Sequence, residues 1–408
     1  MNKNISVTLF IVLIVCLLAA CQKLLPKGPK SEDILAGTIQ GLTQQQVKQH
    51  LIGDASFGKN FSTADGLGPV FVQTSCSNCH SGNGKGHPST VVTRFANING
   101  TLVDYLTDKG GPQLQDHSIS GYTPENIPTQ ANVITKRIAP AVMGLGFIAA
   151  LNDQAILDNS DSSDTNGDGI SGRVNYVEPT SFFSPKNIHI ANGTKYIGRF
   201  GKKAEKITLI DQVVFALKQD IGITSDFDIV DIFNPMVGNN TGDDVPDPEV
   251  SASFVNSLVF YLRTLKAPER RNETDPDVMQ GETLFNQIGC TSCHKQTFVT
   301  GESDIAALSY QTFHPYSDFL IHDMGILLDD GYPEASAKSN EWRTPPLWGL
   351  GLANNSQGGA LFLLHDGRAT SIKGAIAFHG GEAASRKSAF NALTETEKDQ
   401  IIKFLESL

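Results

Sequence analysis

The sequence predicts a mainly α-helical protein with long loops, built from two similar halves of which the first carries a large insertion. Three observations support this prediction. The 408 residues are 40% hydrophobic, which is enough to form one large core or two ordinary ones. The 38 glycines favour extensive loops. A five-residue cysteine motif and a helical pattern each occur twice, which indicates an internal repeat.

The first 20 residues have the pattern of a signal peptide. Lys3 precedes an apolar run over residues 9–20, which is too short for a comfortable transmembrane helix. Small residues come directly before Cys21 and resemble the lipobox of bacterial lipoproteins, in which this cysteine is acylated. An ordinary signal peptide followed by a chance cysteine is the alternative. We expect residues 1–20 to be removed and residues 21–32 to form a tether. The protein is then anchored by lipid in the bacterial cell envelope, on the periplasmic side.

Cys16 leaves with the signal peptide, and the four cysteines after Cys21 all belong to Cys-x-x-Cys-His motifs. These are Cys76-Ser77-Asn78-Cys79-His80 and Cys290-Thr291-Ser292-Cys293-His294. The spacing suits covalently bound haem c, because two thiols reach the two vinyl groups and the adjacent histidine reaches the iron. The alternative is a zinc site that joins the halves, made of the cysteines or of a cysteine and histidine mixture. We expect two covalently bound haems c.

A closing helix at the end of each half supports two haem domains. Residues 258–265 and 401–408 both have apolar positions at helical spacing. Thr394 with Glu397 predicts a capping box for the second helix, and Asp247 followed by proline predicts the start of the first. Phe71 and Phe285 each lie five residues before their motif, which extends the repeat.

The repeat also gives the size of the insertion and the domain boundaries. His80 to Leu265 is 185 residues and His294 to Leu408 is 114, so the first half is longer by 185 − 114 = 71 residues. A charged stretch at 266–273 predicts a linker. We predict an N-terminal cytochrome c-like domain with an insertion at 33–267 and a C-terminal cytochrome c domain at 268–408.

Further motifs resemble the di-haem oxidoreductases, also called thiol oxidoreductases, of the bacterial di-haem cytochrome c peroxidase superfamily. The resemblance covers roughly residues 33–408. The matching segments are DGLGPVF (65–71), QLQ (113–115), RIAPAVMGLG (137–146), DTNGDGISGR (164–173), GRFG (198–201), IHDMG (321–325), EWRTPPLWG (341–349), LHDGRA (364–369) and FHGGEA (378–383).

This resemblance implies a second axial ligand for the second haem. In the superfamily the distal ligand follows a His-x-Gly histidine by 14 positions, and 14 positions after His365 is His379. The resemblance therefore implies a second haem ligated by His294 and His379. The alternative is that His379 is a surface histidine in a glycine-rich turn.

For the first haem, His80 is the expected proximal ligand, and family position puts Gln115 and His117 on the distal side. Gln115 is the candidate for orienting peroxide, and the alternative is a polar surface loop. Counting from the closing helix offers Met236 as another ligand. Many relatives carry a catalytic glutamate where this chain has Ala149, so the acid/base group is not assigned.

Two other features have a predicted role. In superfamily members a tryptophan between the haems helps electrons to cross, and Trp348 is favoured here over Trp342. Asp164, Asn166 and Asp168 lie at positions 1, 3 and 5 of an EF-hand-like calcium loop, although position 12 is Asn175 rather than glutamate. The alternative is a solvated turn.

The resemblance implies a peroxidase-like oxidoreductase whose second haem collects electrons and whose first haem reacts with the oxidant. Expected partners are a small redox donor protein or a quinol-linked cytochrome, and peroxide or another small oxidant. Nucleic acid is not an expected partner, since 32 Lys and Arg residues stand against 43 Asp and Glu. The alternatives are a non-catalytic di-haem electron carrier and an enzyme that oxidatively matures a partner protein.

Overall fold

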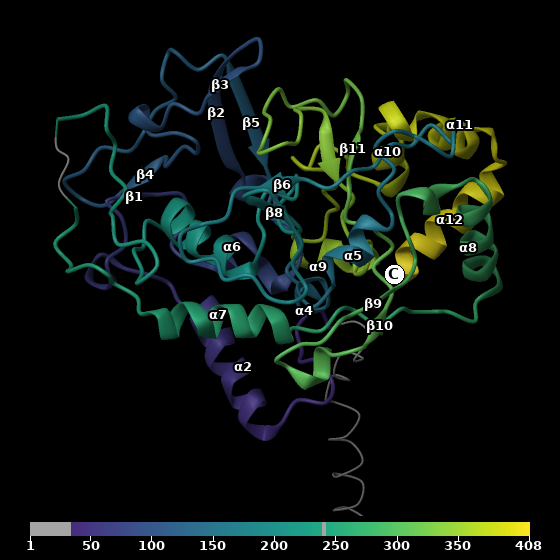
Figure 1. Ribbon diagram of the computed structural model, residues 1–408, viewed down its shortest axis with the longest axis horizontal. Coiled ribbons are helices and arrows are strands. Elements are labelled where there is room, and N and C mark those ends of the chain that lie inside the picture. Colours follow the sequence, from purple (N-terminus) through teal and green to yellow (C-terminus); the bar gives the residue numbers. More distant parts are fainter. Residues whose placement is uncertain (1–33, 239–241) are drawn as a thin grey trace, which may run out of the picture. The chain divides into compact units, whose positions relative to one another are not determined.

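The computed structural model describes residues 34–238 and 242–408 (Figure 1). The predicted signal peptide, Cys21 and the tether lie outside the described residues. Residues 35–408 form one compact unit. None of the helices in the described ranges is long and apolar enough to cross a membrane. The boundary predicted near residue 267 stays a prediction.

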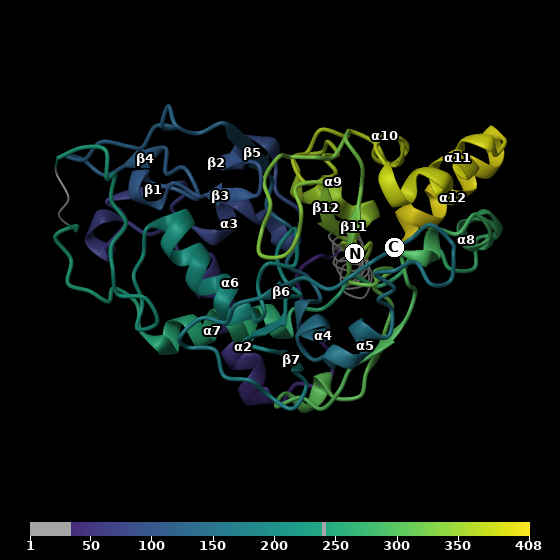
Figure 2. The same cartoon turned by 45° about the horizontal axis from the view of Figure 1, so that its top comes forward.

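A close helix crossing supports the first cysteine motif. Helix α2 (Gln44–Phe57) packs against α7 (Ala252–Thr264), as Figures 1 and 2 show. A Cβ atom at Gly53 would overlap the backbone carbonyl of Ser257, so only glycine permits this approach. Helix α7 begins after Ser251, whose side chain accepts a hydrogen bond from the Phe254 amide. The predicted start at Asp247 was therefore wrong by four residues, because Ser251 supplies the N-cap.

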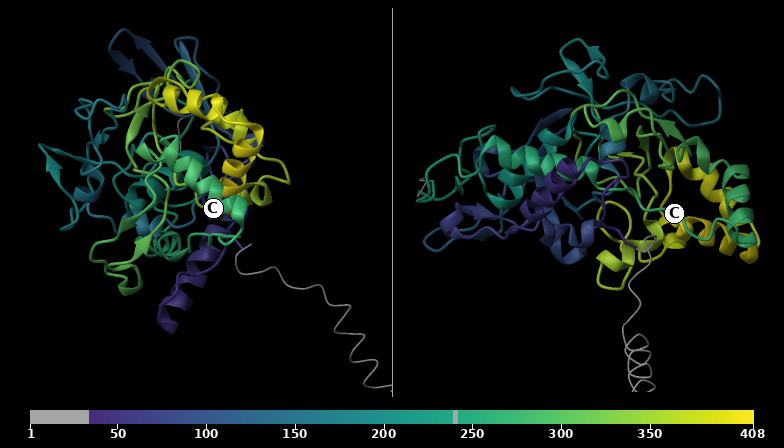
Figure 3. Two further views of the ribbon diagram at one scale, coloured as in Figure 1. Left: turned by 90° about the vertical axis from the view of Figure 1, so that its right-hand side faces the viewer. Right: turned by 90° about the horizontal axis from the view of Figure 1, so that it is seen from below.

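The second half repeats this crossing. Helix α8 (Pro276–Gln287) packs against α12 (Glu395–Ser407), and Figure 3 shows the yellow C-terminal helices beside the green α8. A Cβ atom at Gly281 would overlap the backbone carbonyl of Gln400. The predicted capping box of Thr394 and Glu397 is confirmed at the start of α12.

Aromatic packing under the two motifs is almost the same. The Phe57 ring lies 5.9 Å from His80 at an interplanar angle of 52°, and the Phe285 ring lies 6.0 Å from His294 at 53°. Each phenylalanine follows its crossing glycine by four residues. The predicted counterpart of Phe285 was Phe71, and this was wrong. Phe71 stacks on His117 instead, because 14 more residues separate α2 from its motif.

The remaining helices are short and lie mostly between these two crossings. They are α3 (Cys76–Cys79), α4 (Leu145–Ala149), α5 (Asp153–Leu157), α6 (Leu209–Ala216), α9 (Ala353–Ser356), α10 (Ile372–Ala377) and α11 (Ala384–Ala392).

Small antiparallel sheets, rather than one large sheet, accompany the helices. The three-stranded sheets have the orders β3-β2-β5 and β6-β8-β7, and the two-stranded sheets pair β1 with β4, β9 with β10 and β11 with β12. The strands are β1 (Val70–Phe71), β2 (Val92–Asn99), β3 (Leu102–Asp104), β4 (His117–Ser118), β5 (Val133–Arg137), β6 (Tyr176–Val177), β7 (Ala191–Asn192), β8 (Lys195–Ile197), β9 (Phe298–Val299), β10 (Thr312–Phe313), β11 (Ile321–Asp323) and β12 (Glu341–Arg343). The fold is thus mixed, with more helix than strand and with the long loops that the glycine content predicts.

Two large hydrophobic clusters lie on either side of the cysteine motifs. One includes Phe57, Leu258 and Tyr261 and extends to Trp348, and the other includes Phe285 and Phe404. Each closing helix therefore contributes its apolar face to a different cluster.

Candidate cofactor cavities

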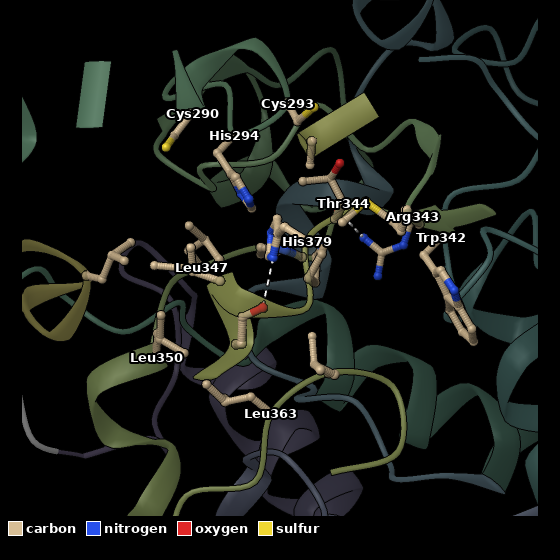
Figure 4. A pocket seen from close by; sticks show the side chains of 18 of the residues that line it. Cys290, Cys293, His294, Trp342, Arg343, Thr344, Leu347, Leu350, Leu363 and His379 are labelled. Carbon is tan, nitrogen blue, oxygen red and sulfur yellow. Dashed lines mark hydrogen bonds between the residues drawn. The ribbon is translucent and has the colours of Figure 1, made fainter. Parts of the chain in front are cut away.

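The second cysteine motif opens into a cavity of about 290 Å³. Its wall contains Cys290, Cys293, His294 and His379, together with many aliphatic side chains (Figure 4). Sequence reasoning brought these four residues together, and the structure places them on one cavity wall.

The two histidines of this cavity face one another, as Figure 4 shows. His294 donates its Nδ1 proton to the Tyr316 carbonyl at 2.9 Å, and His379 donates its Nδ1 proton to the Ala375 carbonyl at 2.9 Å. Within the described chain, neither Nε2 atom has a hydrogen-bond partner. Burial lowers the pKa of His294 to about 4 and lowers the pKa of His379, so both rings are neutral. Neutral imidazoles with a fixed tautomer and a free Nε2 are metal ligands by chemistry.

The first cysteine motif opens into a separate cavity of about 170 Å³, lined by Cys76, Cys79 and His80. Helix α3 spans the motif, and Ser75 caps it by accepting a hydrogen bond from the Ser77 amide. Burial lowers the pKa of His80 to about 4, so this ring is also neutral.

The thiols and their placement argue against the zinc alternative. The four cysteines within the described ranges are free, and burial raises the pKa of Cys76, Cys79 and Cys290 to about 12. Zinc requires thiolates, which this environment disfavours. Among described residues, no potential metal-binding group joins cysteines of both motifs. The two motifs therefore serve two separate sites.

The first cavity lacks the second ligand that the other cavity has. Among the described residues of its wall, His80 is the only histidine and no methionine is present. Glu205 and Gln113 line this wall. A Glu205 carboxylate oxygen accepts a hydrogen bond from the Lys203 amide at 2.9 Å, which fixes its orientation. Sequence reasoning missed Glu205, and its position four residues after the GRFG segment was the only indication of it.

The distal candidates taken from the sequence lie elsewhere. Gln115 is buried but does not line the cavity, and its side-chain amide donates to the Gln219 carbonyl at 3.0 Å. His117 pairs with Asp116, and its side chain is 55% exposed. Met236 is 54% exposed and also lies off the wall. The structure therefore gives Gln115 a bracing contact, and a catalytic role for it stays a prediction.

Three cations on the cavity walls fit a cofactor that carries carboxylates. Lys85 lines the second cavity, and Lys202 and Arg343 line both. Within the described ranges, none of them forms an ion pair with a carboxylate of the chain. Burial lowers the pKa of Lys85 to about 8 and that of Arg343 to about 10. Enclosed cations are costly without anions, and the two propionates of each haem c would supply them. Thiols, neutral histidines and cations together fit this group.

Both tryptophans line the second cavity, but their surroundings differ. The Trp342 ring stacks on His365 at 4.0 Å and 9°, and the Lys203 ammonium lies 4.1 Å from its centroid. Trp348 packs against the Phe313 ring at 6.1 Å. A cation over an indole opposes loss of an electron from the ring, so these contacts favour Trp348 as the redox-active tryptophan.

His322 is a further residue of this region that sequence reasoning did not assign. Its Nδ1 is 2.7 Å from a Glu382 oxygen and its Nε2 is 2.8 Å from an Asp318 oxygen. Although burial opposes it, the Asp318 and Glu382 carboxylates raise the pKa of His322 well above its usual value. Glu382 also accepts from the Ser171 amide at 2.9 Å, which links His322 to the predicted calcium loop.

Asp164, Asn166 and Asp168 lie in one turn. Their oxygens accept hydrogen bonds from the turn itself, with the Gly169 amide on Asp164 at 3.1 Å and the Ile170 amide on Asp168 at 3.0 Å. Among the described residues, they do not belong to a cluster of three close metal-ligating atoms. Calcium binding stays a prediction.

Comparisons with known proteins agree with this arrangement. A family model described as "Di-haem oxidoreductase, putative peroxidase" matches residues 29–108 and 119–408. No curated protein matches the chain. Among solved structures, hydrazine synthase of Kuenenia stuttgartiensis, pressurised with xenon, is similar at a TM-score of 0.37 and 12% identity, over 94% of this chain and 98% of that chain. The unmatched residues 109–118 include Gln115, so the family match does not extend to it.

Proposed function

Since the chain belongs to the di-haem oxidoreductase family, we propose that it holds two covalently bound haems c and reduces peroxide or a similar small oxidant. Cys76, Cys79 and His80 would hold the first haem, and Cys290, Cys293, His294 and His379 the second. When bound, the second haem would collect electrons and the first would react with the oxidant.

The asymmetry of the cavities carries this proposal. The second cavity offers a facing histidine pair, whereas the described wall of the first offers His80 alone. A site with two strong axial ligands suits electron transfer, and a site with one leaves a position at which a substrate can bind. The two cavities thus divide the work between electron uptake and chemistry.

Glu205 is the group that we propose to handle protons in the first cavity. Reduction of hydrogen peroxide to two waters takes two electrons and two protons, so a proton donor is needed beside the substrate. The Glu205 carboxyl lies on the wall with an orientation fixed by the Lys203 amide. Gln113 is held by its donation to Asp220 at 2.7 Å and adds a polar side chain to the same wall.

The setting that we propose is the bacterial cell envelope, with Cys21 as a lipid anchor and a small redox protein or quinol-linked cytochrome as electron donor. Support for the anchor comes from the apolar run and small residues before Cys21. The physical reason for the donor is that the chain contains no further motif for a redox cofactor.

The test uses the full-length chain matured with haem. Mass spectrometry should find two covalent haems, and one-electron reduction followed by peroxide should reoxidise the protein near stoichiometric peroxide. Two low-spin haems that do not react with peroxide would contradict the peroxidase-like function and identify an electron carrier instead.

A further inference from the structure

Two cations lie where the walls of the two cavities meet. The residues that line both cavities are Pro140, Ala141, Leu145, Lys202 and Arg343. Three of these are apolar, so Lys202 and Arg343 are the charged part of the shared wall. They come from segments far apart in the sequence, after strand β8 and at the end of strand β12.

Backbone hydrogen bonds hold the two cations side by side. The Arg343 amide donates to the Lys202 carbonyl at 3.0 Å, and Arg343 Nε donates to the Gly201 carbonyl at 3.0 Å. Gly201 has a φ of +85°, and a Cβ atom there would overlap the Glu205 carboxylate. The turn therefore requires glycine, and it places Lys202 between the cavities and Glu205 in the first cavity.

The charges of this pair are not neutralised by the chain, unlike those of neighbouring cations. Arg137 and Lys203 form ion pairs with Asp330 at 2.9 and 3.1 Å. In the described ranges, Lys202 has no ion pair or side-chain hydrogen bond, and Arg343 bonds only to carbonyls. Enclosed cations without anions are strongly unfavourable, so a partner from outside the polypeptide is required.

We propose that Lys202 and Arg343 together bind one propionate carboxylate from each haem and so form a shared anion-binding bridge between the two redox centres. This inference rests on the proposed content of two haems. Arginine and lysine are suited to it, because both keep donors directed at carboxylates and lie on both walls. The bridge fixes the edges of both cofactors against the same turn.

A shared bridge affects both haems at once. A positive charge close to an iron favours the state with one more electron, so it raises the reduction potential. Removal of Lys202 therefore lowers both potentials. Lys85 lines only the second cavity, so its removal lowers the potential of the second haem and leaves the first unchanged.

The experiment is a spectroelectrochemical titration of the haem-loaded, full-length chain. We compare wild type with Lys202→Met and Arg343→Met, with Lys85→Met and Lys202→Arg as controls. Both bridge variants should lower both midpoint potentials, with a tenfold change in the reduction equilibrium corresponding to about 59 mV. Lys202→Arg should keep both potentials, and Lys85→Met should shift one.

Each outcome decides the matter. A Lys202→Met protein with two haems and unchanged potentials, or with only one shifted, overturns the bridge while leaving the proposed function intact. A wild-type chain without two covalent haems overturns the proposed function itself. If the methionine variants do not mature, Lys202→Arg and Arg343→Lys should mature, and their failure too would show that charge is not the requirement.

Discussion

His294 and His379 show how single hydrogen bonds select a chemical role. Each ring gives its Nδ1 proton to a backbone carbonyl at 2.9 Å, which leaves Nε2 directed into the cavity between them. Burial keeps both rings neutral. A neutral ring with a fixed tautomer is prepared for a metal before the metal arrives.

Replacing His379 by alanine should therefore convert the second haem from a low-spin to a high-spin state, because one of its two axial ligands is lost. Absorption and electron paramagnetic resonance spectra of the haem-loaded variant measure this change. His117→Ala is the matched control, since His117 is exposed and off both walls. An unaltered low-spin spectrum in His379→Ala would remove the ligand assignment.

Glu205→Gln should slow reoxidation by peroxide about 10²- to 10⁴-fold, because the carboxyl can no longer deliver a proton. The resting spectra of both haems should not change. Stopped-flow absorption measures the rate, with Gln115→Ala as comparison. If Gln115→Ala is slow and Glu205→Gln is fast, the sequence-based assignment to Gln115 holds and the one from the cavity wall fails.

At the level of single residues, covalent spacing was far more informative than position relative to a family. The motif cysteines and His294 followed from fixed spacing, and His379 from a fixed offset to His365. Glu205 could not be found in this way, because its place on the wall depends on a glycine turn that joins distant segments. Gln115 lies in the stretch where the family match is interrupted.

Among the elements, the two helix crossings carry the internal repeat. Glycine at each crossing brings the helix backbones together, and a phenylalanine one turn later packs on the motif histidine. The closing helices were predictable from apolar spacing and from the capping box of Thr394 and Glu397. Helix α2 was not, because 14 extra residues hide its relation to α8.

Gly281→Ala should lower the free energy of unfolding by about 1–3 kcal/mol, because the new methyl group overlaps the Gln400 carbonyl and the helices must separate. Denaturant unfolding of the haem-loaded protein measures the loss. Gly58→Ala is the control, since its nearest neighbour would be an ordinary contact at 3.6 Å. Equal stabilities of the two variants would refute the close crossing.

The loop that contains Asp164, Asn166 and Asp168 is proposed to bind calcium. Calorimetric titration of chelator-treated protein should give a binding heat that disappears in Asp164→Ala, because Asp164 supplies the first oxygen ligand. Asp158→Ala, which removes a carboxylate outside the turn, should bind as wild type does. No heat in the wild type would leave the solvated turn as the answer.

For the whole molecule, the separation of two unlike cavities by one shared wall is the central feature. Sequence repetition indicated two sites, but which residues they share arises only from long-range packing. The Lys202 turn meets strand β12, about 140 positions later, through one backbone hydrogen bond. Such contacts depend on the complete fold, so local patterns contain little information about them.

The most direct test of this account is the electron paramagnetic resonance spectrum of the fully oxidised, haem-loaded chain. The account predicts one low-spin centre with two histidine ligands and one centre whose sixth position binds no side chain and responds to an added small ligand such as azide or cyanide. Two six-coordinate low-spin centres, both unresponsive to that ligand, would contradict it.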